Sequence, residues 1–74
     1  MPDLSQLDPG SVCRIAAVRG TDPVAQRLME MGLVPGCTLE FVRRAPLGDP
    51  IQVTLLGYHL SLRRAEAARI EVEP

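Results

Sequence analysis

The segment MGLVPG, residues 31–36, constrains the fold of this chain most strongly, because it marks two changes of chain direction in quick succession. Gly32 supplies the left-handed backbone conformation that commonly ends a helix and that glycine adopts without steric cost. Leu33 can then fold back against the last helical turn in a Schellman contact. Pro35 and Gly36 fit the two central positions of a type II turn. The segment therefore predicts a helix that stops at Gly32, followed by a sharp turn into a strand.

The helix that ends there is predicted over residues 23–31. Thr21 or Asp22 can cap its first turn, and Pro23 suits the first helical position, where no N–H is needed. Its apolar side chains recur at helical spacing and form one stripe, which we expect to face the rest of the fold. The stripe consists of Val24, Leu28 and Met31.

Alternation of apolar and polar residues, typical of half-buried strands, recurs along much of the remaining chain. Between the alternating runs lie a corner loop over 45–50, in which Pro50 restricts the backbone, and a tight connection at Gly57-Tyr58. Val42 is the one residue that departs from the alternation of its run. The pattern predicts five short strands, over 11–18, 37–44, 51–56, 59–63 and 69–73, with a short helical turn over 64–68.

Five short strands with a helix between the first two predict a mainly β fold, a small, partly open barrel. Closure of the sheet removes exposed strand edges, which a chain of 74 residues could not otherwise cover. We expect residues 1–74 to form a single domain, because this length suits one small domain. Such a domain buries only about 60% of its unfolded surface, which leaves little room for a deep enzyme pocket.

Charge and hydropathy argue against several classes of partner. The eight basic residues are all arginine and the formal net charge is −1, whereas general binders of nucleic acid or anionic membranes carry a clear basic excess. No segment approaches the roughly 20 apolar residues of a membrane span. The N-terminus, MPDLSQLDPG, lacks the charged and apolar regions of a signal peptide. These features predict a cytoplasmic location.

Residues that could carry chemistry are few and scattered. Cys13 and Cys37 each lie in a strand-like run and are interpreted as small buried residues in a reducing compartment. His59 is the only histidine and lies beside a turn, where we expect it to be exposed. No C-x-x-C or H-x-x-H spacing occurs, so we expect no metal site and no cofactor. Without a nucleophile–base pair or a phosphate-binding loop, the sequence predicts that the chain is not an enzyme.

Aromatic residues are also too few for two common binding modes. Phe41 and Tyr58 are the only aromatic residues, and we expect Phe41 to point inward. Recognition of proline-rich peptides, or stacking on RNA bases, requires more aromatic surface than this. Binding to another protein needs neither aromatic residues nor net charge, so it is the function class that the composition favours.

Several short motifs occur together at a characteristic spacing. They are Arg27-Leu28, Met31-Gly32-Leu33, Pro35-Gly36, PLGDP at 46–50, Gly57 and Leu62-Arg63. In this combination the chain closely resembles the FeoA domain, the small ferrous-iron transport protein A of bacteria, over about residues 4–72. The resemblance implies an SH3-like barrel with a helical insertion between the first two strands. It also implies a cytosolic accessory to FeoB, the membrane Fe(II) transporter with a GTPase domain.

The same fold resembles the C-terminal domain of metal-dependent repressors of the diphtheria-toxin-repressor type, so two functions stay open. The first is a non-enzymatic adaptor that binds and modulates the FeoB-type transporter. The second is a metal-responsive module, of the sensor or repressor type, that binds Fe(II) itself. The sparse set of metal-ligand residues favours the adaptor. A third, more remote interpretation, an RNA-binding barrel of the ribosomal type, lacks its basic patch here.

The residues singled out by the motifs divide into a structural frame and a contact surface. The frame is expected to fix backbone geometry and consists of Leu28, Met31, Gly32, Pro35, Gly36, Pro50 and Gly57. The solvent side of the helix and the corner loop are expected to contact the transporter. These contact residues are Arg27, Met29, Glu30, Leu33, Arg44 and Pro46. For Met29 an alternative stays open, in which Leu4 or Leu7 of the N-terminal segment covers it and makes it core.

Overall fold

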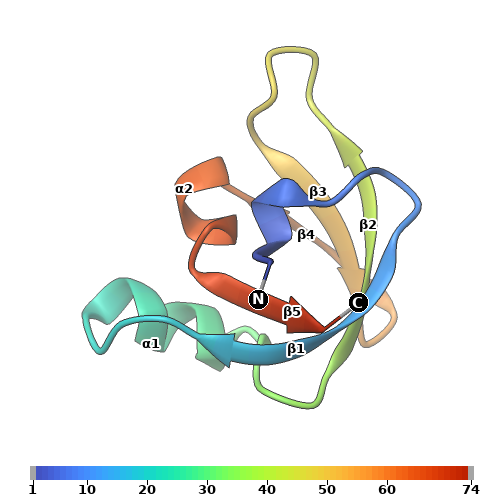
Figure 1. Cartoon of the computed structure of the whole chain (residues 1–74). Coiled ribbons are helices and arrows are strands. Elements are labelled where there is room, and N and C mark those ends of the chain that lie inside the picture. The colour runs from blue at the N-terminus through green and yellow to red at the C-terminus, as the bar shows by residue number, and fades with distance from the viewer. Residues whose placement is uncertain (1, 74) are drawn as a thin grey trace.

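The protein is described by a computed structural model over residues 2–73 (Figure 1). In that range five strands form one antiparallel sheet in the order β4-β3-β2-β1-β5, and one helix lies between the first two strands. This is the mainly β architecture that the sequence predicts. In chain order the elements are η1 (Leu4–Gln6), β1 (Val12–Val18), α1 (Pro23–Glu30), β2 (Thr38–Arg44), β3 (Ile51–Leu55), β4 (Tyr58–Leu62), α2 (Arg64–Ala67) and β5 (Ile70–Glu73).

Two β-bulges help the sheet to curl around its inner face. The β1–β5 register shifts between Ile15 and Ala17, and the β2–β3 register shifts between Phe41 and Arg43. A bulge adds one residue to a strand, bends it and increases its twist. The second bulge accounts for Val42, which interrupts the alternation of its strand. The curled sheet is a partly open barrel, with β4 and β5 as its two edge strands (Figure 1).

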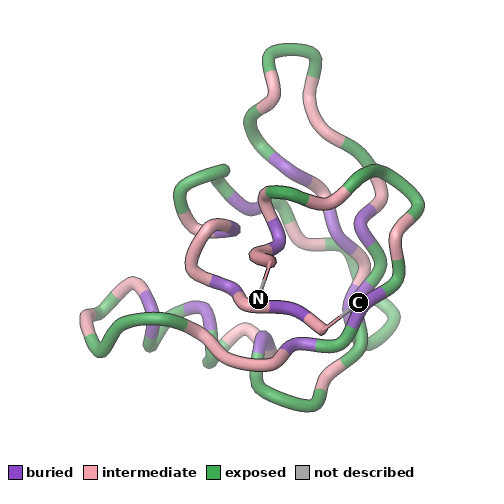
Figure 2. The backbone as a smooth tube through the Cα atoms, in the orientation of Figure 1, coloured by how far each residue is buried: buried purple, intermediate pink, exposed green. Residues whose placement is uncertain are grey.

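The hydrophobic core lies inside the curl of the sheet, and buried positions alternate with more accessible ones along the strands (Figure 2). In β3, for example, Ile51, Val53 and Leu55 are buried, while the residues between them are half-buried. Both helices and the N-terminal turn add apolar side chains to this core. The core cluster consists of Leu4, Cys13, Ile15, Leu28, Leu33, Leu39, Phe41, Ile51, Val53, Leu55, Leu62, Ala67, Ile70 and Val72.

The N-terminal segment is part of the packed structure, and one arginine holds it in place. Leu4 is fully buried, and η1 packs against α2 and β5. The Arg44 guanidinium donates from Nη2 to the carbonyls of Ser5 at 2.9 Å and Leu7 at 2.6 Å. It also lies over the Phe41 ring, 4.9 Å from the centroid. Arg44, which the sequence predicts to contact a partner, is thus half-buried and bonds to the chain's own backbone.

The C-terminal end of α1 forms the predicted Schellman motif. The helix ends at Glu30, one residue earlier than expected, and Gly32 follows with φ 99°. The N–H groups of Gly32 and Leu33 donate to the carbonyls of Met29 and Leu28, at 3.0 and 3.2 Å. These are the two hydrogen bonds that define the motif. The turn at Gly32 carries the chain back under the helix, so Leu33 is fully buried beside the core residues of α1.

Two further turns fix the connections between strands. The Cys37 N–H donates to the Val34 carbonyl at 3.1 Å, and Gly36 has φ 91°, as the predicted type II turn requires. Between β3 and β4, Leu56 and Gly57 both have positive φ, 52° and 83°. Such a pair matches the two-residue type I′ turn of β-hairpins. This turn lies one residue earlier than the sequence predicts, because Leu56 leaves the strand to occupy its first central position.

The N-terminal end of α1 is tied to the strand at the other end of the chain. Asp22 caps the helix, since its side chain accepts the Ala25 N–H at 3.3 Å. The same carboxylate accepts a hydrogen bond from Arg69 Nη1 at 2.5 Å. The hydrogen bond from Arg69 lowers the pKa of Asp22, and the bond from the Ala25 amide lowers it further. The charged form of Asp22 is therefore the form that the folded state favours.

This pairing predicts a pH-dependent contribution to stability. Because the pKa of Asp22 is lower in the folded than in the unfolded chain, its contribution is complete above the unfolded value of about 3.9. It is lost as pH falls through the folded pKa. Asp22→Asn keeps a capping side chain but removes the charge. We expect the variant to melt below the wild type at neutral pH and the difference to shrink in acid, as measured by circular dichroism. A difference that is constant with pH would contradict a role for the charge.

The end of α1 predicts a second stability difference, between two glycines with similar backbone angles. Gly32 and Gly36 have φ 99° and 91°, so alanine at either position costs about 1–3 kcal/mol of strain. A Cβ at residue 32 would also lie 3.3 Å from Leu55 Cδ2 and 3.4 Å from Leu56 Cδ1. Nothing lies within 4 Å of a Cβ at residue 36. We therefore expect Gly32→Ala to lower the free energy of unfolding in urea more than Gly36→Ala does.

Gly32→Val should destabilise more than Gly32→Ala, because a β-branched residue is disfavoured at positive φ. Equal losses for the two alanine variants would show that the contacts around residue 32 contribute nothing. Unchanged stability of the valine variant would show that α1 does not need Gly32 to end.

Candidate partner-binding surface

The solvent side of α1 presents three of the residues that the sequence predicts to contact a partner. Arg27, Met29 and Glu30 are all exposed, and Met29 has 39% of its surface accessible. The N-terminal segment therefore does not cover Met29; it places Leu4 in the core instead. Leu33 is a correction to the predicted surface. It has no accessible surface, because the Schellman motif turns its side chain into the core.

Further apolar side chains lie exposed around the end of α1. Leu56 and Tyr58, at the β3–β4 turn, are 70% and 43% accessible. The turn packs against the helix end, since Tyr58 Oη donates to the Met31 carbonyl at 2.5 Å. Val34, which follows the helix end, is also exposed. We call these residues, Met29, Val34, Leu56 and Tyr58, the α1-end patch. Of these four residues, the sequence predicts only Met29 as a contact residue. The other three are exposed because of where the turn after α1 and the β3–β4 turn lie, which the sequence pattern does not show.

The β2–β3 corner carries the remaining predicted contact residue, Pro46. Pro46 is exposed, and the corner is closed by a hydrogen bond from the Ala45 N–H to the Pro50 carbonyl at 3.0 Å. Leu47, at the tip, is 95% accessible. The corner borders a small hollow of about 160 Å³, lined by Arg43, Ala45, Pro46, Pro50, Gln52 and Ser61.

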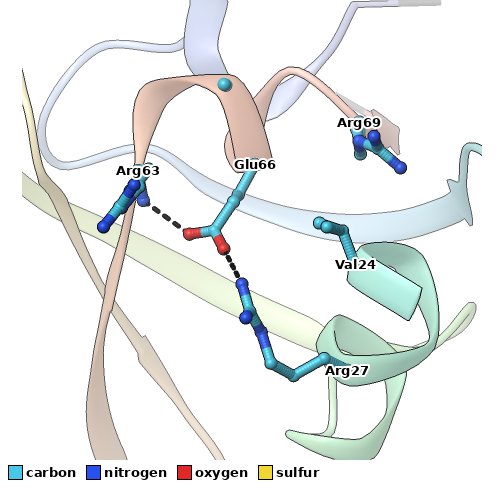
Figure 3. Close-up of a pocket in the computed structure, with 6 residues that line it drawn as sticks. Val24, Arg27, Arg63, Glu66 and Arg69 are labelled. Carbon is cyan, nitrogen blue, oxygen red and sulfur yellow. Dashed lines mark hydrogen bonds and ion pairs between the residues drawn. The ribbon is translucent and has the colours of Figure 1, made fainter. Parts of the chain in front are cut away.

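A larger hollow, of about 440 Å³, lies between the two helices (Figure 3). Of the predicted contact residues only Arg27 borders it. The other members come from the start of α1, from α2 and from the residues on either side of α2. We call this feature the α1–α2 hollow; it is lined by Val24, Arg27, Arg63, Ala65, Glu66 and Arg69.

Glu66 organises one side of the α1–α2 hollow. Its Oε1 accepts the backbone N–H of Arg63 at 2.8 Å, which caps α2, and its Oε2 pairs with the Arg27 guanidinium (Figure 3). The Glu66 side chain is only 14% accessible, whereas that of Arg27 is 59% accessible. The sequence shows the local spacing of Arg63 and Glu66. It does not show that α1 brings Arg27 to them, because the ion pair joins residues 39 positions apart.

The residues considered for metal binding or nucleophilic chemistry do not converge. His59 is exposed, as predicted, with Nδ1 3.0 Å from the Thr54 hydroxyl. Cys13 is buried and Cys37 half-buried, and both are free thiols. Burial raises the pKa of the Cys13 thiol, which disfavours the nucleophilic thiolate. Within residues 2–73 no three His, Cys, Asp or Glu side chains lie together in a way that could hold a metal ion.

Neither helix of the described range is long and apolar enough to cross a membrane.

Comparison with known proteins relates this fold to ferrous-iron transport. The family model for the FeoA domain matches residues 3–74. A curated relative from Porphyromonas gingivalis, a fusion protein of Fe(2+) transport protein A and the Fe(2+) transporter FeoB, is 44% identical over 70 residues. The match covers 95% of this chain but only 8% of the relative. The chain thus corresponds to a small part of that protein.

Solved structures agree with the family match. Iron(II) transport protein A from Clostridium thermocellum superposes with a TM-score of 0.90 at 42% identity, over 96% of this chain and 44% of that one. FeoA from Stenotrophomonas maltophilia, a prokaryotic SH3 domain protein solved in complex with zinc, has a TM-score of 0.86 at 30% identity. That match covers 99% of this chain and 91% of the other. The predicted SH3-like fold is therefore confirmed, and the chain belongs to the FeoA domain family.

Proposed function

We propose that this chain is a small cytosolic, non-enzymatic accessory of ferrous-iron uptake, which binds a FeoB-type Fe(II) transporter and modulates it. The observation that carries the proposal is the relative in which a 44% identical segment and FeoB are one polypeptide. Fusion keeps two modules at a high effective concentration, which is useful where they act on each other. A FeoA domain that acts on FeoB in this way needs a surface that binds the transporter.

The α1-end patch supports this proposal as the main contact surface. Its exposed side chains include a methionine and a tyrosine, Met29 and Tyr58. Methionine adapts to irregular partner surfaces, and tyrosine is enriched among the residues that dominate binding energy. Glu30, the residue after Met29, is exposed and can supply part of a polar rim. Arg27 lies on the other side of the helix, where it pairs with Glu66. Pro46 and the β2–β3 corner offer a second place at which the transporter could make contact.

A metal-responsive module is the second candidate, because the Stenotrophomonas maltophilia relative was solved in complex with zinc. In this chain the described residues hold no cluster of three candidate ligands, and His59 bonds only to Thr54. Anaerobic titration of the apo protein with Fe(II) separates the two candidates. We expect no tight one-to-one binding, and we expect His59→Ala to support iron uptake as well as the wild type does. Tight stoichiometric binding, or a folded His59→Ala protein that fails in uptake, would favour the metal-responsive module.

The proposed contact surface predicts the effect of one charge placed on α1. Met29→Asp should abolish co-purification with the cytosolic part of FeoB, because a carboxylate would lose its water in the interface. Its melting temperature should stay close to that of the wild type, since Met29 is exposed. Leu47→Asp tests the alternative contact, because it makes the same kind of change at the exposed tip of the corner. Retained binding by Met29→Asp together with lost binding by Leu47→Asp would move the contact to the corner.

A further inference from the structure

The α1–α2 hollow concentrates positive charge on a chain whose net charge is −1. Three of the eight arginines line it, with Glu66 as the only acidic lining residue. The arginines come from α1, from the residue before α2 and from the residue before β5, so the fold brings them together from separate positions. Each guanidinium has five N–H donors in a planar fork that matches a carboxylate.

Of the three arginines that line the hollow, Arg63 is the one whose guanidinium has no partner among the described residues. Its backbone N–H donates to Glu66, but within residues 2–73 its guanidinium has no hydrogen bond or ion pair with a protein group. The residue is exposed and is one of those that line the hollow, beside Glu66 (Figure 3). Arg63 therefore offers its whole donor fork to a ligand.

The other two arginines also keep donors that face solvent. Arg27 and Arg69 each have one carboxylate partner, Glu66 and Asp22, yet their side chains remain 59% and 34% accessible. Glu66 is the reverse case, because its carboxylate bonds to two donors and its side chain is only 14% accessible. The arginine side chains that line the hollow are therefore more accessible to solvent than the Glu66 side chain.

The existing ion pair and the lining residues indicate what kind of ligand fits. The Arg27–Glu66 pair shows that a carboxylate can approach the Arg27 guanidinium from within the hollow. Two apolar lining residues, Val24 and Ala65, provide contact area for a short aliphatic side chain. The hollow therefore combines donors for carboxylates with apolar surface between them.

We propose that the α1–α2 hollow binds an acidic peptide segment in which carboxylates flank an apolar side chain. The carboxylates pair with Arg63 and with the free donors of Arg27 and Arg69, and the apolar side chain contacts Val24. The source of the acidic segment rests on the proposed function: it would be the cytosolic part of the transporter. Binding of such a peptide to the hollow does not depend on which protein supplies it, so it can be tested without the transporter.

The test uses two peptides, EELEE and QQLQQ, both acetylated and amidated, which differ only in charge. Each is titrated into the ¹⁵N-labelled full chain, and the side-chain Nε–Hε signals of arginine and the backbone amide signals are followed by NMR. We expect EELEE to shift the Nε–Hε signals of Arg27, Arg63 and Arg69 more than those of the other arginines, and QQLQQ to shift them little. Binding should weaken as salt is added, because exposed ion pairs are screened.

Two matched variants locate the binding. Arg63→Gln should weaken EELEE binding about three- to fivefold, the effect of one exposed ion pair. Arg43→Gln removes the same charge beside the other hollow and should leave binding unchanged. The proposal is overturned if EELEE causes no shifts, if the shifts are spread over all arginines, or if the two variants weaken binding equally. Peptide binding at the hollow by a chain that fails to bind FeoB would refute the proposed function and leave this site standing.

Discussion

The left-handed backbone at Gly32 determines where α1 ends and how the segments after it pack. It ends α1, satisfies two of the helix's terminal carbonyls and turns Leu33 into the core. The β3–β4 turn packs against this same point, where Leu55, Leu56 and Tyr58 all lie within 3.4 Å of the place that a side chain would occupy. A single glycine thus ends the helix and leaves room for the turn that exposes Leu56 and Tyr58, two of the four residues of the α1-end patch.

The two ion pairs of α1 complete the placement of the helix. Arg69 holds Asp22 at its start, and Glu66 holds Arg27 near its end, so both pairs join α1 to the C-terminal part of the chain. Exposed ion pairs add little to stability, but pairs with good geometry restrict the orientation of a helix. One short helix, fixed in this way, borders both surfaces that we associate with binding: the apolar α1-end patch and the basic α1–α2 hollow.

Local signals account for what the sequence predicts correctly. Glycine and proline specify the Schellman motif at Gly32 and the type II turn at Gly36. Alternation of apolar and polar residues specifies the strands. All of these features depend on residues that are close together in the sequence. Arg44 and Glu66 take their roles from contacts with segments 37–39 positions away, which no local pattern reports. Leu33 was predicted both to fold back on the helix and to contact a partner. Only the first is compatible with its complete burial.

Binding of the wild-type chain to the cytosolic part of FeoB is the decisive measurement for the proposed function. It is best made by calorimetric titration and co-purification of the two purified proteins, with and without a non-hydrolysable GTP analogue. We expect a saturable complex of defined stoichiometry in at least one nucleotide state. Absence of binding in both states, with both proteins folded, would contradict the proposed function.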